Sequence, residues 1–114
     1  MNNLRNSVHL IGNLGMDPEI KTLESGKKMA RFSIATSETY RNNEGRQIKE
    51  TQWHNIVAWG GSATIAEKYL SKGKEVAIQG RLSHRSYEDK TGSTRYVTEI
   101  IANEIALLGG GKKD

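Results

Sequence analysis

The sequence predicts a mostly β fold, a small, partly open barrel with one helix that plugs one end. Val, Ile and Thr recur along the 114 residues, and clusters of Gly, Asn and Asp interrupt them at short intervals. This pattern is typical of short strands joined by turns. Only one stretch, at about 62–71, has helical spacing. We therefore expect three strands or so, one helix, and then two strands.

The first half of the chain predicts three strands. Residues 8–11 form the first, and the glycines and turn residues that follow them end it. Residues 28–36 alternate in polarity, with Phe32 and Ile34 on the face that we assign to the core. The Asn and Gly residues at 42–45 then predict an extended hairpin that returns through residues 48–59.

The second half predicts the helix and two more strands. Ser62 is the expected N-cap, because its hydroxyl can accept an orphan backbone N–H, and Gly73 is the expected left-handed stop. One side of this helix is apolar, and we assign Tyr69 on that side to packing. The remaining elements are a strand at 75–82, a turn at 89–93 and a last strand from residue 95 to about 101 or beyond.

Composition narrows the class of protein. The chain has 17 Lys and Arg against 13 Asp and Glu, a net charge of +4 and a pI near 9.4, which favours anionic partners. It has no Cys, no run of about 18 apolar residues and no signal-peptide pattern, so disulfides, thiol chemistry, a membrane span and export are not expected. We expect one domain at 1–108, followed by a flexible stub at 109–114.

The sequence contains no complete catalytic or metal-binding motif. Residues 60–64 come close to a nucleophile elbow but lack its closing Gly, and Ser62 is better explained as a helix cap. His9, His54 and His84 are widely spaced, which favours structural roles over metal ligation. We therefore expect neither an enzyme nor a bound cofactor or metal.

Strand parity places charge beside an aromatic ring on the strand that begins at residue 75. Its even positions are apolar and are expected to face the core, Leu82 among them. The odd face then points outward, and if the extended run continues past Leu82 it carries Arg81, Arg85 and Tyr87. Guanidinium groups neutralise phosphates and a ring is a platform for an unstacked base, as single-stranded nucleic acid requires. A solvated strand with one isolated Tyr is the alternative interpretation.

The run from Trp53 to Trp59 carries a second signal. Both rings leave the same face of a strand, while Ile56 and Ala58, which are better core candidates, occupy the opposite face. One interpretation buries both Trp side chains in the core, because Trp normally contributes a large buried area. The other makes their face a half-exposed apolar surface that bases can cover.

The hairpin turn at 42–45 repeats this pairing of ring and cation. Tyr40 and Arg41 precede the turn, and Arg46 and Lys49 add positive charge across it. A Tyr at this place could also brace the hairpin by cross-strand packing, so both interpretations stand.

Six runs of residues resemble bacterial single-stranded DNA-binding proteins, the SSB family. They are IGNLGMDPE at 11–19, FSIATSE at 32–38, TQWHNIV at 51–57, AEKYLSKG at 66–73, IQGRL at 78–82 and RYVTEI at 95–100. Together they span nearly the whole chain in the right order. The resemblance implies a five-stranded oligonucleotide-binding (OB) fold with one helix and an extended β-hairpin. It also implies a non-enzymatic homotetramer that wraps single-stranded DNA in replication, recombination and repair.

The resemblance also assigns site residues. Four positions match those that stack on DNA bases, namely Tyr40, Trp53, Trp59 and Tyr87. Arg5, Lys72 and Arg85 match cations that approach the DNA backbone. Arg41 and Lys49 beside the hairpin turn, and Arg81, a cation at a position that is often neutral in relatives, complete the expected phosphate contacts. His54 matches a position at the subunit interface. Four positions that often carry Lys or Arg in relatives are neutral in this chain, which leaves the path of the DNA strand open: Asn55, Gly61, Ser83 and Ser86.

The C-terminus departs from the family pattern. Relatives usually end in a long flexible tail with an acidic, Phe-containing tip that recruits replication and repair proteins, whereas this sequence ends in GGGKKD. Either a truncated core or a naturally tailless form fits this ending, so we expect such partners only if an acidic tail follows residue 114. The expected location is the bacterial cytoplasm, at the nucleoid and without membrane contact. The alternative function is an OB-fold accessory subunit, primosome-like, that acts through protein–protein contacts.

Overall fold

The computed structural model of the protein describes residues 5–108. Its elements are β1 (Val8–Leu14), β2 (Glu19–Thr22), β3 (Lys28–Arg41), β4 (Gln47–Trp59), α1 (Gly61–Tyr69), β5 (Glu75–Glu88) and β6 (Thr94–Leu107). The mostly β architecture with one helix is confirmed. The expected stub at 109–114 lies outside the described residues. Within residues 5–108, no helix is long and apolar enough to cross a membrane.

Five of the strands form a barrel. Their order is β1–β5–β6–β4–β3, and Asn13 and Leu14 of β1 pair with β3, which closes the ring. The barrel is thus closed, although only two residue pairs join β1 to β3. β2 pairs with β3 outside the ring and was not predicted. Its four residues include a single apolar side chain, so they lack the alternation that marks a strand.

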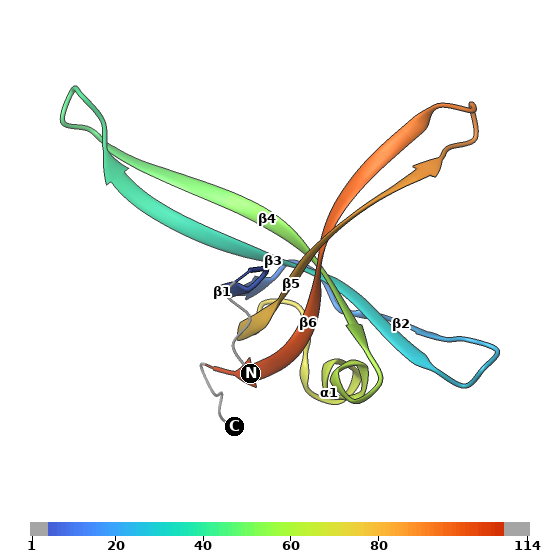
Figure 1. Ribbon diagram of the computed structural model, residues 1–114. Coiled ribbons are helices and arrows are strands. Elements are labelled where there is room, and N and C mark those ends of the chain that lie inside the picture. The colour runs from blue at the N-terminus through green and yellow to red at the C-terminus, as the bar shows by residue number, and fades with distance from the viewer. Residues whose placement is uncertain (1–4, 109–114) are drawn as a thin grey trace.

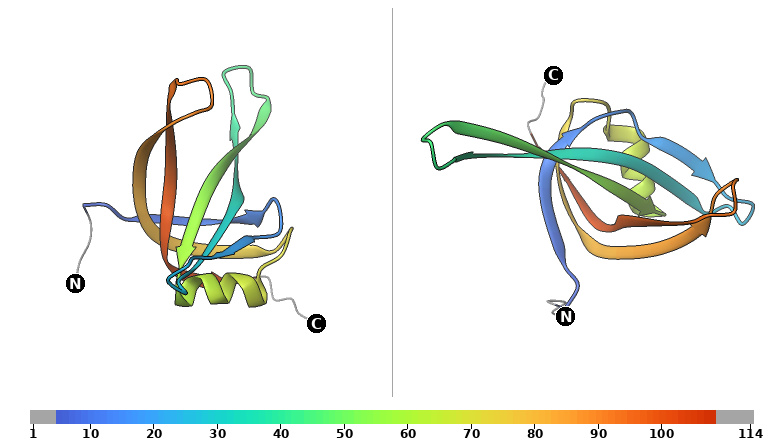
Figure 2. Two further views of the ribbon diagram at one scale, coloured as in Figure 1. Left: turned by 90° about the vertical axis from the view of Figure 1, so that its right-hand side faces the viewer. Right: turned by 90° about the horizontal axis from the view of Figure 1, so that it is seen from above.

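Two long hairpins extend from the barrel. β3 pairs with β4 from Met29–Trp59 to Arg41–Gln47, and β5 pairs with β6 along nearly its whole length. Figure 1 shows the two hairpins diverging, and in Figure 2 both rise from the end of the barrel opposite α1. We call them the β3–β4 arm and the β5–β6 arm. The second arm was not predicted, because residues 83–88 lack the apolar alternation that marked residues 75–82.

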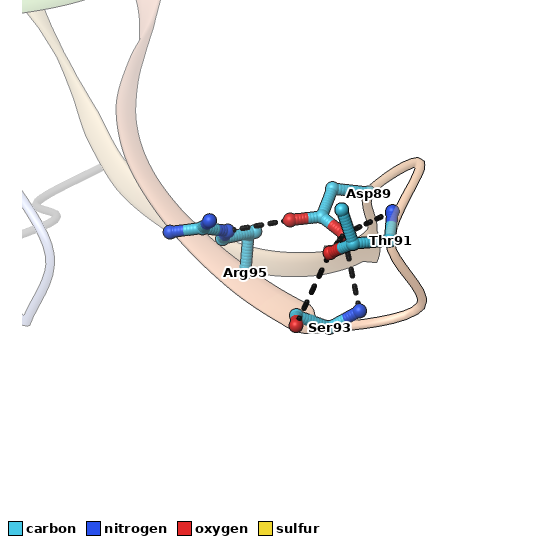
Figure 3. A network of polar contacts seen from close by, with 4 residues as sticks. All are labelled: Asp89, Thr91, Ser93 and Arg95. Carbon is cyan, nitrogen blue, oxygen red and sulfur yellow. Dashed lines mark hydrogen bonds and ion pairs between the residues drawn. The ribbon is translucent and has the colours of Figure 1, made fainter.

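Both arms end in the same kind of turn. Asn42 Oδ1 accepts hydrogen bonds from the backbone N–H groups two and four residues later, at 2.9 and 3.0 Å. Equivalent bonds of 2.9 and 3.0 Å form around Asp89 Oδ1, and Arg95 Nε donates to the other carboxylate oxygen at 2.7 Å (Figure 3). Gly45 and Gly92 occupy the fourth place with φ of 80° and 85°, which glycine adopts without strain. Both predicted turns are confirmed.

The core fills the barrel and continues under the helix. The largest fully buried side chains come from β3, β4 and β5, and they are Phe32, Ile34, Ile56, Val76 and Ile78. Ala63 and Ala66 of α1 are fully buried, so the helix approaches the barrel end closely. Each large side chain contributes roughly 1.5–3 kcal/mol by leaving water, and this shared core holds the bases of both arms. The core assignment of Phe32 and Ile34 is confirmed.

The predicted N-cap of the helix is wrong. The helix begins at Gly61, so Ser62 lies inside its first turn, and Gly60 is the N-cap with no side-chain bond. The Gly60 carbonyl accepts the Thr64 N–H at 3.0 Å. Gly73 has the expected positive φ, 89°, but it follows the C-cap Leu70 by three residues, so it shapes the next loop and does not end the helix.

Two side chains assigned to packing are exposed. Tyr69 is 53% exposed because the side of the helix that packs on the barrel is formed by Ala63, Ala66 and Leu70, and Tyr69 lies about 100° around the helix from Leu70. Leu82 is 41% exposed. It follows the irregularity at Gln79–Gly80, where β5 leaves the barrel for its arm, and the inward face has no opposite wall beyond that point. Parity thus predicted the direction of Leu82 but not its burial.

Candidate nucleic-acid interface

The odd-numbered residues of β3 and β4, of β5 from Arg81 onward and of β6 up to Ile101 form one continuous surface, which we call the outer face. Within the barrel the even-numbered residues of these segments face the core, and the strand register pairs odd residues with odd residues. On the other side of the irregularity at Gln79–Gly80 the parity changes, because Ile78 pairs with Ile105. Ser33 lies opposite Asn55, Val57 opposite Ile101, and Ser83 opposite Glu99. Side chains far apart in the sequence are thereby collected on one side of the barrel and the bases of the arms.

Trp53 is the most exposed aromatic side chain of the outer face, with 61% of its surface accessible. It lies opposite Ala35, and its ring covers Gly15, whose backbone N–H donates to the Ser33 carbonyl at 3.1 Å. A Cβ at Gly15 would overlap two carbons of this ring, so the ring rests directly on backbone. A broad apolar platform therefore faces solvent at the base of the β3–β4 arm.

Trp59 lies at the other end of the same strand and is half-buried. Met29 is opposite it, and Lys27 Nζ lies 4.9 Å from the centroid of its ring, within the range of a cation–π contact. Ile56 and Ala58 on the opposite face are fully buried. Of the two interpretations of this strand, the half-exposed apolar surface is confirmed.

Tyr87 and Arg85 extend the outer face along the β5–β6 arm. Tyr87 is 48% exposed, and the guanidinium carbon of Arg85 lies 6.0 Å from the centroid of its ring. Beside them is a hollow of about 510 Å³, lined by Arg31, Asn55, Arg85, Tyr87, Val97 and Glu99. The hollow collects residues from all four strands of the face.

Glu99 is the only buried charged residue in the range 5–108. Arg85 donates from Nε and Nη2 to its two carboxylate oxygens, at 3.1 and 3.2 Å, and Arg31 Nη2 lies 3.6 Å from one of them. The hydrogen bond and the charge of Glu99 raise the pKa of Arg85. Arg85, expected as a phosphate contact, thus already has an anionic partner within the chain.

Tyr40 is separated from the other three aromatic positions. It is 49% exposed and lies opposite Ile48 near the tip of the β3–β4 arm. Its even position places it on the side of the arm away from Trp53, which lies five residue pairs nearer the barrel. Trp53, Trp59 and Tyr87 therefore share one face, and a ligand that also contacts Tyr40 must cross the twisted arm.

The expected phosphate contacts are all exposed, but they are scattered. Arg41 and Lys49 lie on the β3–β4 arm, and Arg81 lies on the outer face opposite Ile101. Arg5 precedes Asn6, whose side chain forms two hydrogen bonds with the backbone of β5. Lys72 is in the loop between α1 and β5, where its N–H donates to Asp17 at 2.8 Å.

The three His residues occupy separate places. His54 Nε2 and Thr36 Oγ1 are 3.0 Å apart, and His84 Nδ1 and Thr98 Oγ1 are 2.8 Å apart. These contacts support the structural roles assigned to both. The place of His54 at a subunit interface stays a prediction. In the part of the chain that the structure describes, no three His, Asp or Glu side chains gather in a way that could hold a metal.

Sequence reasoning missed three members of this surface, namely Lys27, Arg31 and Glu99. Alternation puts Arg31 on the side of its strand opposite Phe32 and Ile34, and it could have placed Glu99 opposite the apolar Ile100 in the same way. It could not have shown that they meet, since they lie on β3 and β6. Lys27 precedes β3 and reaches Trp59 only through the pairing of β3 with β4.

Comparison with models of protein families matches the chain to one family, over a range that includes this whole surface. Residues 5–108 match the model of the single-strand binding protein family. Single-stranded DNA-binding protein 1 of Chlorobaculum tepidum is 45% identical over 115 residues, which cover 96% of this chain and 71% of the relative. The single-stranded DNA-binding protein of Neisseria meningitidis serogroup A is 44% identical over 105 residues, which cover 92% of this chain and 60% of the relative.

Two solved structures resemble the fold. The Plasmodium falciparum SSB in complex with ssDNA has a TM-score of 0.86 and 36% identity, covering 95% of this chain and 99% of that one. The single-stranded DNA binding protein from Thermus aquaticus, a deletion mutant, has a TM-score of 0.81 at 24% identity, covering 92% of this chain and 51% of that one, and shows the fold alone. The barrel is therefore the OB fold expected from the sequence.

Proposed function

Because this chain belongs to the single-strand binding protein family, we propose that it binds single-stranded DNA without reading its sequence. The observation that carries the proposal is the outer face, where an exposed Trp53 lies on the same surface as Trp59 and Tyr87 and near several cations. Exposed rings on a sheet are costly in water unless a partner covers them, and unstacked bases are such a partner. Proteins of this family are DNA-binding proteins and not enzymes, so the proposal includes no catalytic step.

Stacking accounts for binding that tolerates any sequence. Every base has a π-face, and a base stacked on an aromatic side chain is worth about 1–3 kcal/mol. Trp53, Trp59 and Tyr87 offer such platforms along the outer face, and Tyr40 offers a fourth further along the β3–β4 arm. Tyr in two of the four positions keeps the π-face but offers less stacking area than Trp.

Lys and Arg side chains neutralise the phosphates. Arg41 and Lys49 line the β3–β4 arm, Arg81 lies on the outer face, and Arg5 and Lys72 flank the barrel. We add Lys27, which the Trp59 ring holds beside the platform. Each phosphate neutralised releases condensed counterions, so affinity falls as salt rises.

Self-association into a homotetramer completes the proposal. β1 pairs with β5 along residues 8–13 but with β3 only at its end, so one edge of β1 is free of strand partners in the described chain. Next to it lies a hollow of about 430 Å³ lined by His9, Leu10, Ile11, Ala77, Ile78, Gln79, Glu104 and Ala106, and Ile11 is 59% exposed. An unpaired edge beside apolar surface favours pairing with another copy.

The wider role is part of the same proposal. A protein that binds single-stranded DNA tightly and independently of its sequence can protect the single strands formed in replication, recombination and repair. The chain spans 60% of the Neisseria relative, so recruitment of other proteins is proposed only if an acidic tail follows residue 114. The expected location is the bacterial cytoplasm, at the nucleoid.

Intrinsic fluorescence tests the proposal directly. Titration of the chain with oligo-dT should quench the emission of Trp53 and Trp59, since stacked bases cover the rings. Repeating the titration at two salt concentrations should give a lower affinity at the higher one. Absence of quenching at stoichiometric dT would remove both Trp side chains from the site.

The alternative, an accessory subunit that acts through protein contacts, predicts a different result. In that case Trp53→Ala breaks association with a protein partner while dT binding is unchanged. The ring–cation pairs at Trp59 and Tyr87 favour DNA as the partner. A single strand uses both members of such a pair, the ring for a base and the cation for the negatively charged backbone, whereas a protein partner has no general need of this combination.

A further inference from the structure

A carboxylate lies at the centre of a surface proposed to bind a polyanion. The Glu99 side chain is 7% exposed and lines the hollow beside Tyr87. A phosphate entering that hollow would meet this negative charge, and like charges repel. The position of Glu99 is therefore informative about which part of the DNA strand the hollow accepts.

Glu99 holds the Arg85 guanidinium in one plane. Two parallel N–H groups of Arg85 donate to its two oxygens, at 3.1 and 3.2 Å, which is the bidentate geometry that orients a guanidinium best. A guanidinium has five N–H donors, so three remain available. The Arg85 side chain is 46% exposed and lies 6.0 Å from the Tyr87 ring, so a positioned donor group stands beside an aromatic platform.

Glu99 also neutralises part of the positive charge of Arg31 and Arg85. Arg31 Nη2 lies 3.6 Å from the same carboxylate, so two cations and one anion share the cluster. A phosphate at Arg85 would gain less there than at an isolated cation such as Lys49, and would release correspondingly fewer counterions. A base is neutral and meets no such repulsion, and the three free donors can reach its edge.

We propose that this cluster is a subsite for a nucleobase and not for a phosphate, with Glu99 as the positioning residue that fixes Arg85 beside Tyr87. The inference rests on the proposed binding of single-stranded DNA and refines one element of it. The hollow of about 510 Å³ lies within the size range of small-molecule sites, roughly 300–1,000 Å³. The strand backbone then follows the other exposed cations.

Salt dependence separates the two kinds of contact. The slope of log affinity against log salt changes by about 0.7 for each phosphate that a single strand gains or loses. Glu99→Gln keeps the shape of the side chain but leaves two uncompensated cations, so a phosphate is newly attracted and the slope steepens by about 0.7. The double variant Arg85→Gln/Glu99→Gln has the same net charge as the original cluster, and its slope stays unchanged.

Glu67→Gln is the matched control for overall charge. It also removes one carboxylate from an ion pair, since Glu67 bonds Lys28 at 2.5 Å, but it does so on the helix. Its slope should equal that of the parent chain. Equal steepening in Glu67→Gln and Glu99→Gln would mean a general effect of net charge and would overturn the proposal.

The rival interpretation makes Arg85 a phosphate contact that DNA pulls away from Glu99. It predicts an unchanged slope in Glu99→Gln and a slope flatter by about 0.7 in the double variant. Unchanged slopes in both variants and unchanged affinity would mean that the cluster does not touch DNA, which also overturns the proposal. Thermal unfolding shows whether each variant is folded, and if Glu99→Gln alone does not fold, the double variant still decides between the two slopes.

An abasic strand gives a second readout. Oligo-dT and an abasic strand of equal length carry the same phosphates, but only the first carries bases. The double variant should bind oligo-dT about two- to fivefold more weakly than the parent chain and should bind the abasic strand equally well. An equal loss on both strands contradicts a base contact. If the parent chain binds neither strand, the proposed function itself fails, which is a distinct outcome.

Discussion

Trp53 presents the largest exposed ring of the outer face, and we expect it to contribute most to stacking. Trp53→Ala should weaken oligo-dT binding by about 1–3 kcal/mol, roughly five- to 150-fold, because one stacked base loses its platform. Stability should change little, since the ring is mostly in solvent. Titrations monitored by DNA anisotropy, together with thermal unfolding, measure both effects.

Tyr69→Ala is the control for this prediction. Tyr69 is similarly exposed, 53%, but it lies on α1 at the opposite end of the barrel from the arms. Its removal should leave the affinity for dT unchanged. If both variants lose affinity equally, or if Trp53→Ala loses none, the outer face is not the binding surface.

Gly15 determines where the Trp53 ring can lie. A Cβ at this position would overlap the ring carbons Cζ3 and Cη2, and the exposed ring can move aside more easily than backbone. Gly15→Ala should therefore shift the ring, lower dT affinity severalfold and change stability by no more than about 0.5 kcal/mol. In a Trp59→Phe background the emission of Trp53 alone reports its movement. An unshifted emission maximum with unchanged affinity would contradict this role of Gly15.

At the scale of elements, the two arms have the same turn with one chemical difference. Asn42 organises the β3–β4 turn and Asp89 the β5–β6 turn, through equivalent bonds to backbone N–H groups. Asp89 is also paired with Arg95 at 2.7 Å (Figure 3). The hydrogen bond from Arg95, helped by Thr91, lowers the pKa of Asp89 from 3.8 to about 2.

This shift predicts that the tip of the β5–β6 arm is sensitive to acid. Because the folded pKa lies below the ordinary one, ionised Asp89 stabilises the turn fully above about pH 4. That contribution is lost as the pH falls from about 4 toward 2. Amide hydrogen exchange at Thr91 and Ser93 should accelerate over this range.

Asp89→Asn supplies the comparison, and Asn42 shows that an Asn can form the same turn. The variant keeps the bonds to the backbone but cannot ionise, so its exchange rates at these amides should lack the acid-dependent step. A step of equal size in both proteins would show that other carboxylates cause it.

At the scale of the whole molecule, we expect the free edge of β1 and its apolar hollow to be the surface through which copies of the chain associate. Ile11→Glu should place a charge where two copies meet and shift the mass measured by light scattering toward the 12.7 kDa of one chain. Leu23→Glu is the matched control, because Leu23 is also exposed, 40%, but lies outside the hollow. A parent chain that already scatters as a monomer, or an Ile11→Glu variant with unchanged mass, contradicts the assembly.

Local patterns along the chain were enough to predict the class of fold, the strands that form the core, and the family. Alternation needs only neighbouring residues, so it placed Phe32, Ile34, Ile56 and Ala58 inside the barrel and Tyr87 outside it. The arm turns were equally predictable, because Asn42–Gly45 and Asp89–Gly92 bond within themselves. Motifs along the chain then indicated the family that the comparison confirms.

The tertiary structure alone decided which of these residues act together. Leu82 has the expected direction but lies exposed, because burial depends on an opposite wall that β5 leaves behind at Gly80. Tyr40 matches a stacking position but lies on the other side of its arm. Glu99 meets Arg31 and Arg85 only because β5, β6, β4 and β3 are neighbours in that order, so that Arg31 reaches Glu99 across β4. Parity is a local property, whereas partners across a barrel depend on the register that the packed core imposes.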